Sequence, residues 1–122
     1  MKLASDVMSS PVVTVGWMES LEEASRRMDV YRFSFLPVMG PGDKVVGVVT
    51  KTDVIHYMHA VGERRLVKAI MSPVALTCSP ADDLCEVVRT MDANRIHHLV
   101  VLDDDRPVGI ISALDILHAV VE

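Results

Sequence analysis

The sequence predicts a mixed α/β protein of two β-α-β-β-α repeats that pack together with pseudo-two-fold symmetry. The first observation is an echo: GVVTKTDVI at residues 47–55 recurs as GIISALDIL at residues 109–117. The second is an alternation of short apolar runs of strand length with segments of helical periodicity. The third is composition, because 50% of the 122 residues are hydrophobic, which is enough for a core.

The repeat extends over nearly the whole chain. Met8 recurs as Met71, 63 positions later, whereas Gly47 recurs as Gly109, 62 positions later. The one lost residue falls in the segments MGPGDKV and LDDDRPV, which are rich in Gly, Pro and Asp and are typical of hairpin turns. Turns are where a duplicated unit tolerates a change of length.

Two domains follow from this repeat, one at residues 1–62 and the other at residues 63–122. A unit of about 60 residues buries too little surface to be comfortably stable alone. We therefore expect the two copies to pack on each other.

Each copy begins with a short helical turn and a brief extended segment, VMSSPVVTV or IMSPVALTC. A helix follows, LEEASRRM or LCEVVRTM, with its apolar residues on one face. Ser20 with Glu23, and Asp83 with Glu86, have the spacing of a capping box at the start of these helices.

The rest of each copy predicts a β-hairpin and a second helix. FLPVM and HLVVL read as first strands, and VVGVVT and PVGIIS as second strands. The second helices begin near Asp53 and Asp115, and the first of them should end near Gly62.

Composition also excludes several classes of protein. A net charge of −5 without a basic run argues against nucleic-acid binding. No apolar run approaches the ~20 residues of a transmembrane helix, and no secretory signal stands out, so we expect no membrane insertion and a cytoplasmic location. Cys78 and Cys85 lack zinc-like spacing, so no metal site is predicted.

The segments quoted above, in this order and duplicated, resemble a tandem pair of CBS domains, also called a Bateman module. The resemblance implies a regulatory module that binds AMP, ADP, ATP or a related adenosyl ligand in clefts between the repeats and modulates a partner. It also implies a homodimer. The alternative within the same family is a ligand-free dimerisation or scaffold module.

The residues themselves support a nucleotide site at two positions. Thr50 with Asp53, and Ser112 with Asp115, lie where a strand gives way to a helix. Free backbone N–H groups and the helix dipole favour a phosphate or polar sugar there. An ionised aspartate accepts hydrogen bonds, as the two hydroxyls of a ribose require. The alternative interpretation is an ordinary helix cap.

The resemblance assigns the remaining site residues. The adenine-side residues are Val12, Val13 and Thr14 in the first copy, and Val74, Ala75 and Leu76 in the second. The phosphate-side residues are Arg32, Arg95, His97 and His98.

The resemblance also pairs these residues unequally. Asp53 should share a cleft with His97 and His98, and Asp115 with Ser34 and Phe35, so the Asp53 site should bind phosphorylated adenosine more tightly. Because a bound phosphate raises the pKa of histidine, affinity should increase as pH falls from about 8 to about 6.5.

Catalysis is not expected. The chain has no nucleophile elbow, P-loop or Rossmann fingerprint, and the repeats occupy its length. No cofactor is predicted. A separately encoded enzyme or transporter is one partner that would fit, and the sequence leaves open whether the partner is encoded separately. The apolar second helices, at residues 54–61 and 116–121, should form the homodimer.

Overall fold

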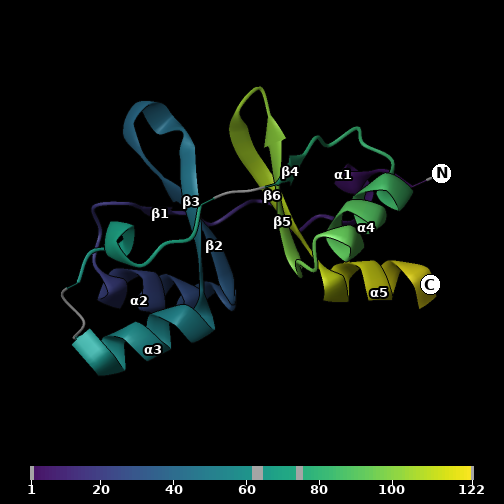
Figure 1. Ribbon diagram of the computed structural model, residues 1–122. Coiled ribbons are helices and arrows are strands. Elements are labelled where there is room, and N and C mark those ends of the chain that lie inside the picture. Colours follow the sequence, from purple (N-terminus) through teal and green to yellow (C-terminus); the bar gives the residue numbers. More distant parts are fainter. Residues whose placement is uncertain (1, 62–64, 74–75, 122) are drawn as a thin grey trace. The chain divides into compact units, whose positions relative to one another are not determined.

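The computed structural model describes residues 2–61, 65–73 and 76–121 (Figure 1). The chain divides into two compact units. One unit is Val13–Val74, and the other joins Met1–Val12 to Ala75–Glu122.

The Val13–Val74 unit contains a three-stranded sheet and two α-helices. Its sheet has the order β1-β2-β3, with β1 parallel to β2 and β2 antiparallel to β3. Its elements are β1 (Val15–Gly16), α2 (Leu21–Tyr31), β2 (Phe35–Met39), the 3-10 turn η1 (Pro41–Asp43), β3 (Val45–Thr50), α3 (Lys51–Val61) and the 3-10 turn η2 (Val67–Ala69).

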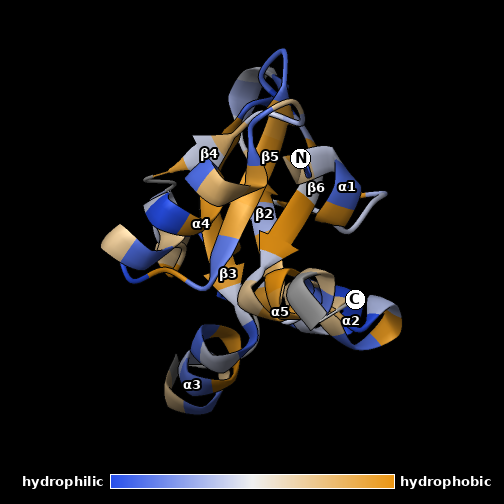
Figure 2. Cartoon of the chain, turned by 90° about the vertical axis from the view of Figure 1, so that its right-hand side faces the viewer, coloured by the Kyte–Doolittle hydropathy of each residue, from blue (hydrophilic) through white to orange (hydrophobic). Residues whose placement is uncertain are grey.

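The second unit repeats this plan. Its sheet has the order β4-β5-β6, again with one parallel and one antiparallel pairing. Strands β5 and β6 are predominantly hydrophobic (Figure 2), as their burial requires. Its elements are α1 (Ala4–Val7), β4 (Thr77–Cys78), α4 (Leu84–Ala93), β5 (His98–Asp103), β6 (Arg106–Ser112) and α5 (Ala113–Val121).

The predicted fold class and element order are therefore confirmed. The predicted apolar face of the first helix is buried, as Leu21, Ala24 and Met28 show. The β5–β6 turn places Asp104 and Asp105 at φ 50° and 65°. Two positive φ angles are what a two-residue type I′ hairpin turn needs, and aspartate tolerates them better than most residues.

The capping-box prediction holds only in part. Ser20 Oγ accepts a hydrogen bond from the Glu23 N–H at 3.1 Å, but the Glu23 carboxylate accepts from Arg26 and Arg27 and not from the Ser20 N–H, so only half of this box forms. Asp83 instead accepts from the N–H of Cys85, at 2.9 Å, one residue earlier than a capping box requires. Both positions are orphan N–H donors in the first turn of a helix, and an N-cap side chain can accept from either of them.

The compact units do not follow the limits of the sequence repeats. In one unit the opening segment of the chain is anchored by Ala4, which is fully buried and whose N–H donates to the Asp82 carbonyl at 2.9 Å. In the other, Val67 is fully buried and its N–H donates to the Glu19 carbonyl at 2.8 Å. Each unit therefore incorporates the opening segment of the other repeat.

Candidate functional site: two strand-to-helix junctions

The first candidate site is the junction of β3 and α3. Strand β3 ends at Thr50 and α3 begins at Lys51. Thr50 Oγ1 accepts a hydrogen bond from the Asp53 N–H at 3.2 Å. The Asp53 carboxylate is half-buried and has no hydrogen-bond partner within the described part of the chain. The hydroxyl thus caps the helix, while the carboxylate keeps its acceptor capacity for another group.

The second candidate site is the junction of β6 and α5, and it is built differently. Ser112 Oγ accepts from the Asp115 N–H at 3.1 Å, and the Ser112 N–H donates to Asp115 Oδ2 at 3.0 Å. This reciprocal pair is a capping box. One carboxylate oxygen of Asp115 is therefore engaged by the backbone, in contrast to Asp53. The helix-cap interpretation is correct for Thr50 and for both residues of the second pair.

In each unit, the strand next to the junction places two of the predicted site residues beside the junction of their own repeat, whereas the pairing predicted from the resemblance joins residues of different repeats. Phe35 pairs with Thr50 in the β2–β3 register, and the Ser34 carbonyl accepts from the Lys51 N–H at 2.8 Å. In the other unit, His98 pairs with Ser112. The His97 carbonyl accepts from the N–H of residue 113 at 2.9 Å. Ser34 and His97 are thus equivalent positions beside the two junctions.

The environment of His98 lowers its pKa. Burial is the main cause, the neighbouring His97 adds to it, and the charge of Asp115 acts in the opposite direction. His98 is therefore predominantly neutral at pH 7. A phosphate near it would have to draw a proton onto the ring before a charge-assisted hydrogen bond forms.

The two predicted arginines lie at corresponding places. Arg32 follows α2 at φ 63°, and Arg95 follows α4 at φ 54°; both are exposed. The left-handed conformation reverses the chain at the end of each helix.

The predicted adenine-side residues are only partly described. Val13 and Thr14 lie immediately before β1 and are half-buried, whereas Val12 belongs to the other compact unit. Leu76 is half-buried before β4, and Val74 and Ala75 lie outside the described residues.

Sequence reasoning missed one residue that contacts this segment. Arg27 on α2 donates from Nη1 to the Thr14 carbonyl at 2.8 Å. The spacing of Arg27 from Glu23 indicates a helical ion pair, but nothing local indicates the contact with Thr14.

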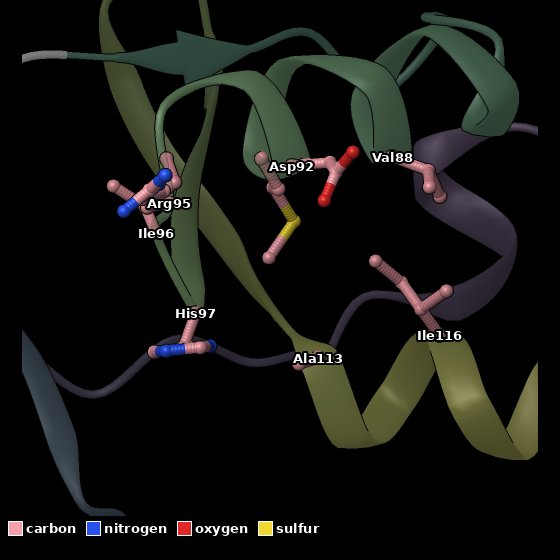
Figure 3. A pocket seen from close by; sticks show the side chains of 8 residues that line it. Val88, Asp92, Arg95, Ile96, His97, Ala113 and Ile116 are labelled. Carbon is pink, nitrogen blue, oxygen red and sulfur yellow. The ribbon is translucent and has the colours of Figure 1, made fainter.

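Two cavities of the described residues lie elsewhere, between the helices of each unit. A cavity of about 490 Å³ has an apolar lining from α4 and α5, with Asp92, Arg95 and His97 at its edge (Figure 3). A cavity of about 350 Å³ lies between α2 and α3 and is lined in part by Arg26, Lys51 and Met58. Neither cavity is lined by the hydroxyl–aspartate pairs of the junctions.

Within residues 2–61, 65–73 and 76–121, no three His, Cys, Asp or Glu side chains are arranged to hold a metal ion. Both cysteines are free, and burial together with the charge of Asp82 raises the pKa of Cys78 to about 11. None of the helices in the described segments combines the length and apolar character needed to cross a membrane.

Comparison with known proteins identifies the family that shares this architecture. The profile of the CBS domain matches residues 4–60 and again residues 67–122. Inosine-5′-monophosphate dehydrogenase of Methanocaldococcus jannaschii is 34% identical over 118 residues, which cover 95% of this chain and 23% of that enzyme. The gamma-3 subunit of human 5′-AMP-activated protein kinase is 34% identical over 100 residues, covering 74% of this chain and 20% of the subunit. The chain spans less than a quarter of the length of either relative.

Comparison with solved structures leads to the same family. A CBS domain pair in complex with 5′-methylthioadenosine and S-adenosyl-L-methionine matches with a TM-score of 0.87 and 25% identity, over 98% of this chain and 96% of that one. An uncharacterised conserved protein from Pyrococcus horikoshii matches with a TM-score of 0.84 and 29% identity, over 100% and 96% of the two chains. The chain therefore belongs to the CBS domain family as a tandem pair, homologous to CBS modules that bind adenosyl ligands.

Proposed function

We propose that the chain is a regulatory module that binds an adenine nucleotide, such as AMP, ADP or ATP, and modulates a partner enzyme or transporter. The observation that carries the proposal is the Asp53 carboxylate, half-buried at a strand-to-helix junction with no hydrogen-bond partner in the described segments. The carboxylate oxygens of Asp53 are open to solvent and are not engaged by the described residues, so their acceptor capacity is available to a ligand that supplies donors. The CBS pair bound to two adenosyl compounds supports this choice of ligand.

The chemistry of the junction suits a nucleoside. An ionised carboxylate can accept hydrogen bonds from both hydroxyls of a ribose. The first backbone N–H groups of α3, with the positive end of the helix dipole, favour a phosphate or polar group nearby. Val13 and Thr14, with Leu76 in the second repeat, would contact the adenine. Arg32, Arg95, His97 and His98 would provide the positive charge for the phosphates.

The two junctions should differ in affinity. Asp115 already accepts a hydrogen bond from the Ser112 N–H at 3.0 Å, so a ribose there must compete with the backbone. Asp53 has no such competitor among the described residues. We therefore expect the Asp53 site to be the tighter site for AMP or ADP.

Calorimetric titration with AMP, ADP, ATP and S-adenosylmethionine tests this function. We expect Asp53→Asn to abolish the tighter site and Asp115→Asn to leave it intact, since asparagine keeps the size of the side chain but loses its charge. The double change His97→Ala/His98→Ala should weaken the site that depends on Asp53, as the resemblance implies. An adenine nucleotide at 100 times its Kd should also stabilise the fold by about 2.7 kcal/mol.

Two results would overturn the proposal. One is the absence of both heat and thermal shift with any of the four ligands. The other is loss of the tighter site in Asp115→Asn while Asp53→Asn still binds, which would reverse the assignment of the sites.

A ligand-free dimerisation module is the second candidate. Large apolar side chains are exposed on the second helices, with Ile55 at 57%, Leu114 at 59% and Leu117 at 55%. Such side chains are typical of interfaces. Sedimentation at micromolar concentration, read together with the titration above, separates the candidates: a stable homodimer that binds none of the four ligands favours the scaffold, and a nucleotide-binding protein favours the sensor.

A further inference from the structure

Arg27 connects α2 to the segment that begins the first repeat. Its guanidinium donates from Nη1 to the Thr14 carbonyl at 2.8 Å, from Nη2 to Glu19 at 2.7 Å and from Nε to Glu23 at 3.0 Å. The other oxygen of Glu19 accepts from the Gly16 N–H at 2.6 Å. The Arg27 side chain is 25% exposed, so water screens these contacts only partly. The planar guanidinium thus holds the backbone before β1 directly, at Thr14, and holds the end of β1 through Glu19, which binds the Gly16 N–H.

The second repeat keeps the carboxylates but lacks the arginine. Asp82 corresponds to Glu19, and its carboxylate accepts from the Ser79 N–H at 2.9 Å, as Glu19 does from Gly16. Glu86 corresponds to Glu23. Thr90 stands in the place of Arg27, and its short side chain cannot span the same distance.

A cavity lies where that guanidinium would be. It measures about 70 Å³, and its lining includes the repeat counterparts of Arg27 and of the three residues that Arg27 binds. The lining residues are Thr77, Cys78, Asp82, Glu86, Val87, Thr90 and Leu99. Each stands 63 positions after its counterpart in the first repeat. The two repeats thus share one arrangement of equivalent residues, which surrounds the Arg27 side chain in the first repeat and a cavity in the second.

We infer that Arg27 is a positioning residue that holds Val13–Thr14 in the conformation that receives the adenine, and that the second repeat lacks this device. The inference rests on the proposed function, because it assumes that the segment contacts a nucleotide. A segment ordered in advance loses less conformational entropy on binding, which raises affinity without a new contact to the ligand. Arg27 would make the two adenine-side segments unequal even though both begin with similar sequences.

Three variants of the first repeat test the inference. Arg27→Met removes the fork, Arg27→Lys keeps the charge beside Glu19 and Glu23 but not the planar geometry, and Arg26→Met is the matched control on the same helix. Among the residues that the structure describes, Arg26 forms its hydrogen bonds with Glu23 alone, at the surface. We expect Arg27→Met to weaken AMP binding about tenfold, Arg27→Lys to fall between, and Arg26→Met to match the wild type.

Hydrogen exchange in the absence of ligand gives the second measurement. Arg27→Met should speed exchange in a peptide covering residues 12–16, and Arg26→Met should not. Faster exchange with unchanged AMP affinity would overturn the inference, since Arg27 would then be purely structural. If the wild type binds no adenine nucleotide, the proposed function itself fails, and that result is read before any variant is compared.

A graft into the second repeat keeps the test decisive if Arg27→Met does not fold. Thr90→Arg should fill the 70 Å³ cavity, slow exchange in a peptide covering residues 76–79 and tighten the weaker AMP site. Val88→Arg, on an exposed position of the same helix, controls for added charge. Slower exchange without tighter AMP binding in Thr90→Arg would contradict the positioning role.

Discussion

At the scale of single residues, equivalent positions in the two repeats have different surroundings. The hydroxyl residues Thr50 and Ser112 both cap a helix, but only Asp115 returns a hydrogen bond to the backbone. His97 and His98 occupy the positions of Ser34 and Phe35, so the strand beside the junction carries two imidazole rings in the second repeat and none at the equivalent positions of the first. A duplicated sequence therefore produces two sites with different chemistry.

The lowered pKa of His98 makes stability depend on pH. In the folded protein this pKa lies below 6.5, whereas in the unfolded chain it returns to about that value. As pH falls, the unfolded state therefore takes up a proton before the folded state does. The contribution of neutral His98 to the free energy of unfolding is complete above pH 6.5 and is lost as pH falls toward the folded pKa. We expect the free energy of unfolding to decline between pH 7.5 and 5.5 more steeply for the wild type than for His98→Gln.

Urea unfolding at several pH values measures this difference. His118→Gln is the control, because His118 is an exposed residue on α5. Parallel pH profiles for the wild type and His98→Gln would contradict the assignment.

AMP binding at pH 7 should also take up protons if a phosphate approaches His98, which titration in buffers of different ionisation enthalpy would detect.

At the scale of secondary-structure elements, a methionine crosses a glycine in each unit. Gly47 lies on β3 beneath Met71, and Gly109 lies on β6 beneath Met8. A Cβ atom at Gly47 would lie 2.8 Å from the Met71 sulfur and 2.8 Å from the Ser72 carbonyl oxygen. At Gly109 it would lie 2.6 Å from the Met8 sulfur and 3.0 Å from a carbonyl oxygen. These glycines allow the opening segment of the other repeat to approach the sheet.

Alanine at either glycine should destabilise the fold by about 1–3 kcal/mol, as overpacking usually does. The two positions should respond differently to a second change. Met8→Ala removes the main clash with Gly109→Ala, so this pair should show a favourable coupling energy in a double-mutant cycle. Met71→Ala should rescue Gly47→Ala less, because the Ser72 carbonyl oxygen lies 2.8 Å from the new Cβ and is held by the Val48 N–H at 2.8 Å. The Ser9 carbonyl oxygen, in contrast, lies 3.0 Å from a Cβ at Gly109, and its bond from the Ile110 N–H is longer, at 3.2 Å. Equal coupling energies for the two pairs in chemical unfolding would contradict this explanation.

At the scale of the whole molecule, each compact unit is completed by a segment from outside its own repeat. Residues 2–9 join the unit of the second repeat through the Leu84 N–H and Lys2 carbonyl at 3.0 Å and the Ser9 N–H and Ile110 carbonyl at 2.8 Å. Residues 65–73 join the unit of the first repeat through the Leu21 N–H and Arg65 carbonyl at 2.8 Å. The chain connectivity therefore makes the stability of each unit depend on the other repeat's opening segment.

Removal of residues 1–9 should consequently affect the distant half of the sequence. The deletion uncovers the surface around Met91 and Ile111 that Ala4 helps to bury and frees the backbone edge at Ile110. We expect faster hydrogen exchange in β6 and α4, with smaller changes in β2 and β3. Faster exchange mainly in residues 13–61 would show instead that the segment serves the neighbouring repeat.

Much of the fold could be predicted because the signals are local. The duplicated GVVTKTDVI and GIISALDIL motifs, the helical spacing of Leu21, Ala24 and Met28, and the turn residues of both hairpins indicate the element order directly. The junction residues Thr50, Asp53, Ser112 and Asp115 could be named for the same reason, since strand ends and helix starts are visible in sequence. Their hydrogen-bond partners could not, because a hydroxyl and a carboxylate at this spacing permit several capping geometries.

The sequence alone determined that this protein is a tandem repeat with a hydroxyl–aspartate pair at each second helix. Periodicity and duplication are properties of neighbouring or regularly spaced residues, and they need no folded chain to be recognised. Only the tertiary structure decided that Arg27 holds Thr14, that Thr90 leaves a cavity, and that the segment around Ala4 completes the second repeat. Those contacts join residues far apart in the chain, and their free energy depends on burial and geometry that arise only when the sheets and helices have packed.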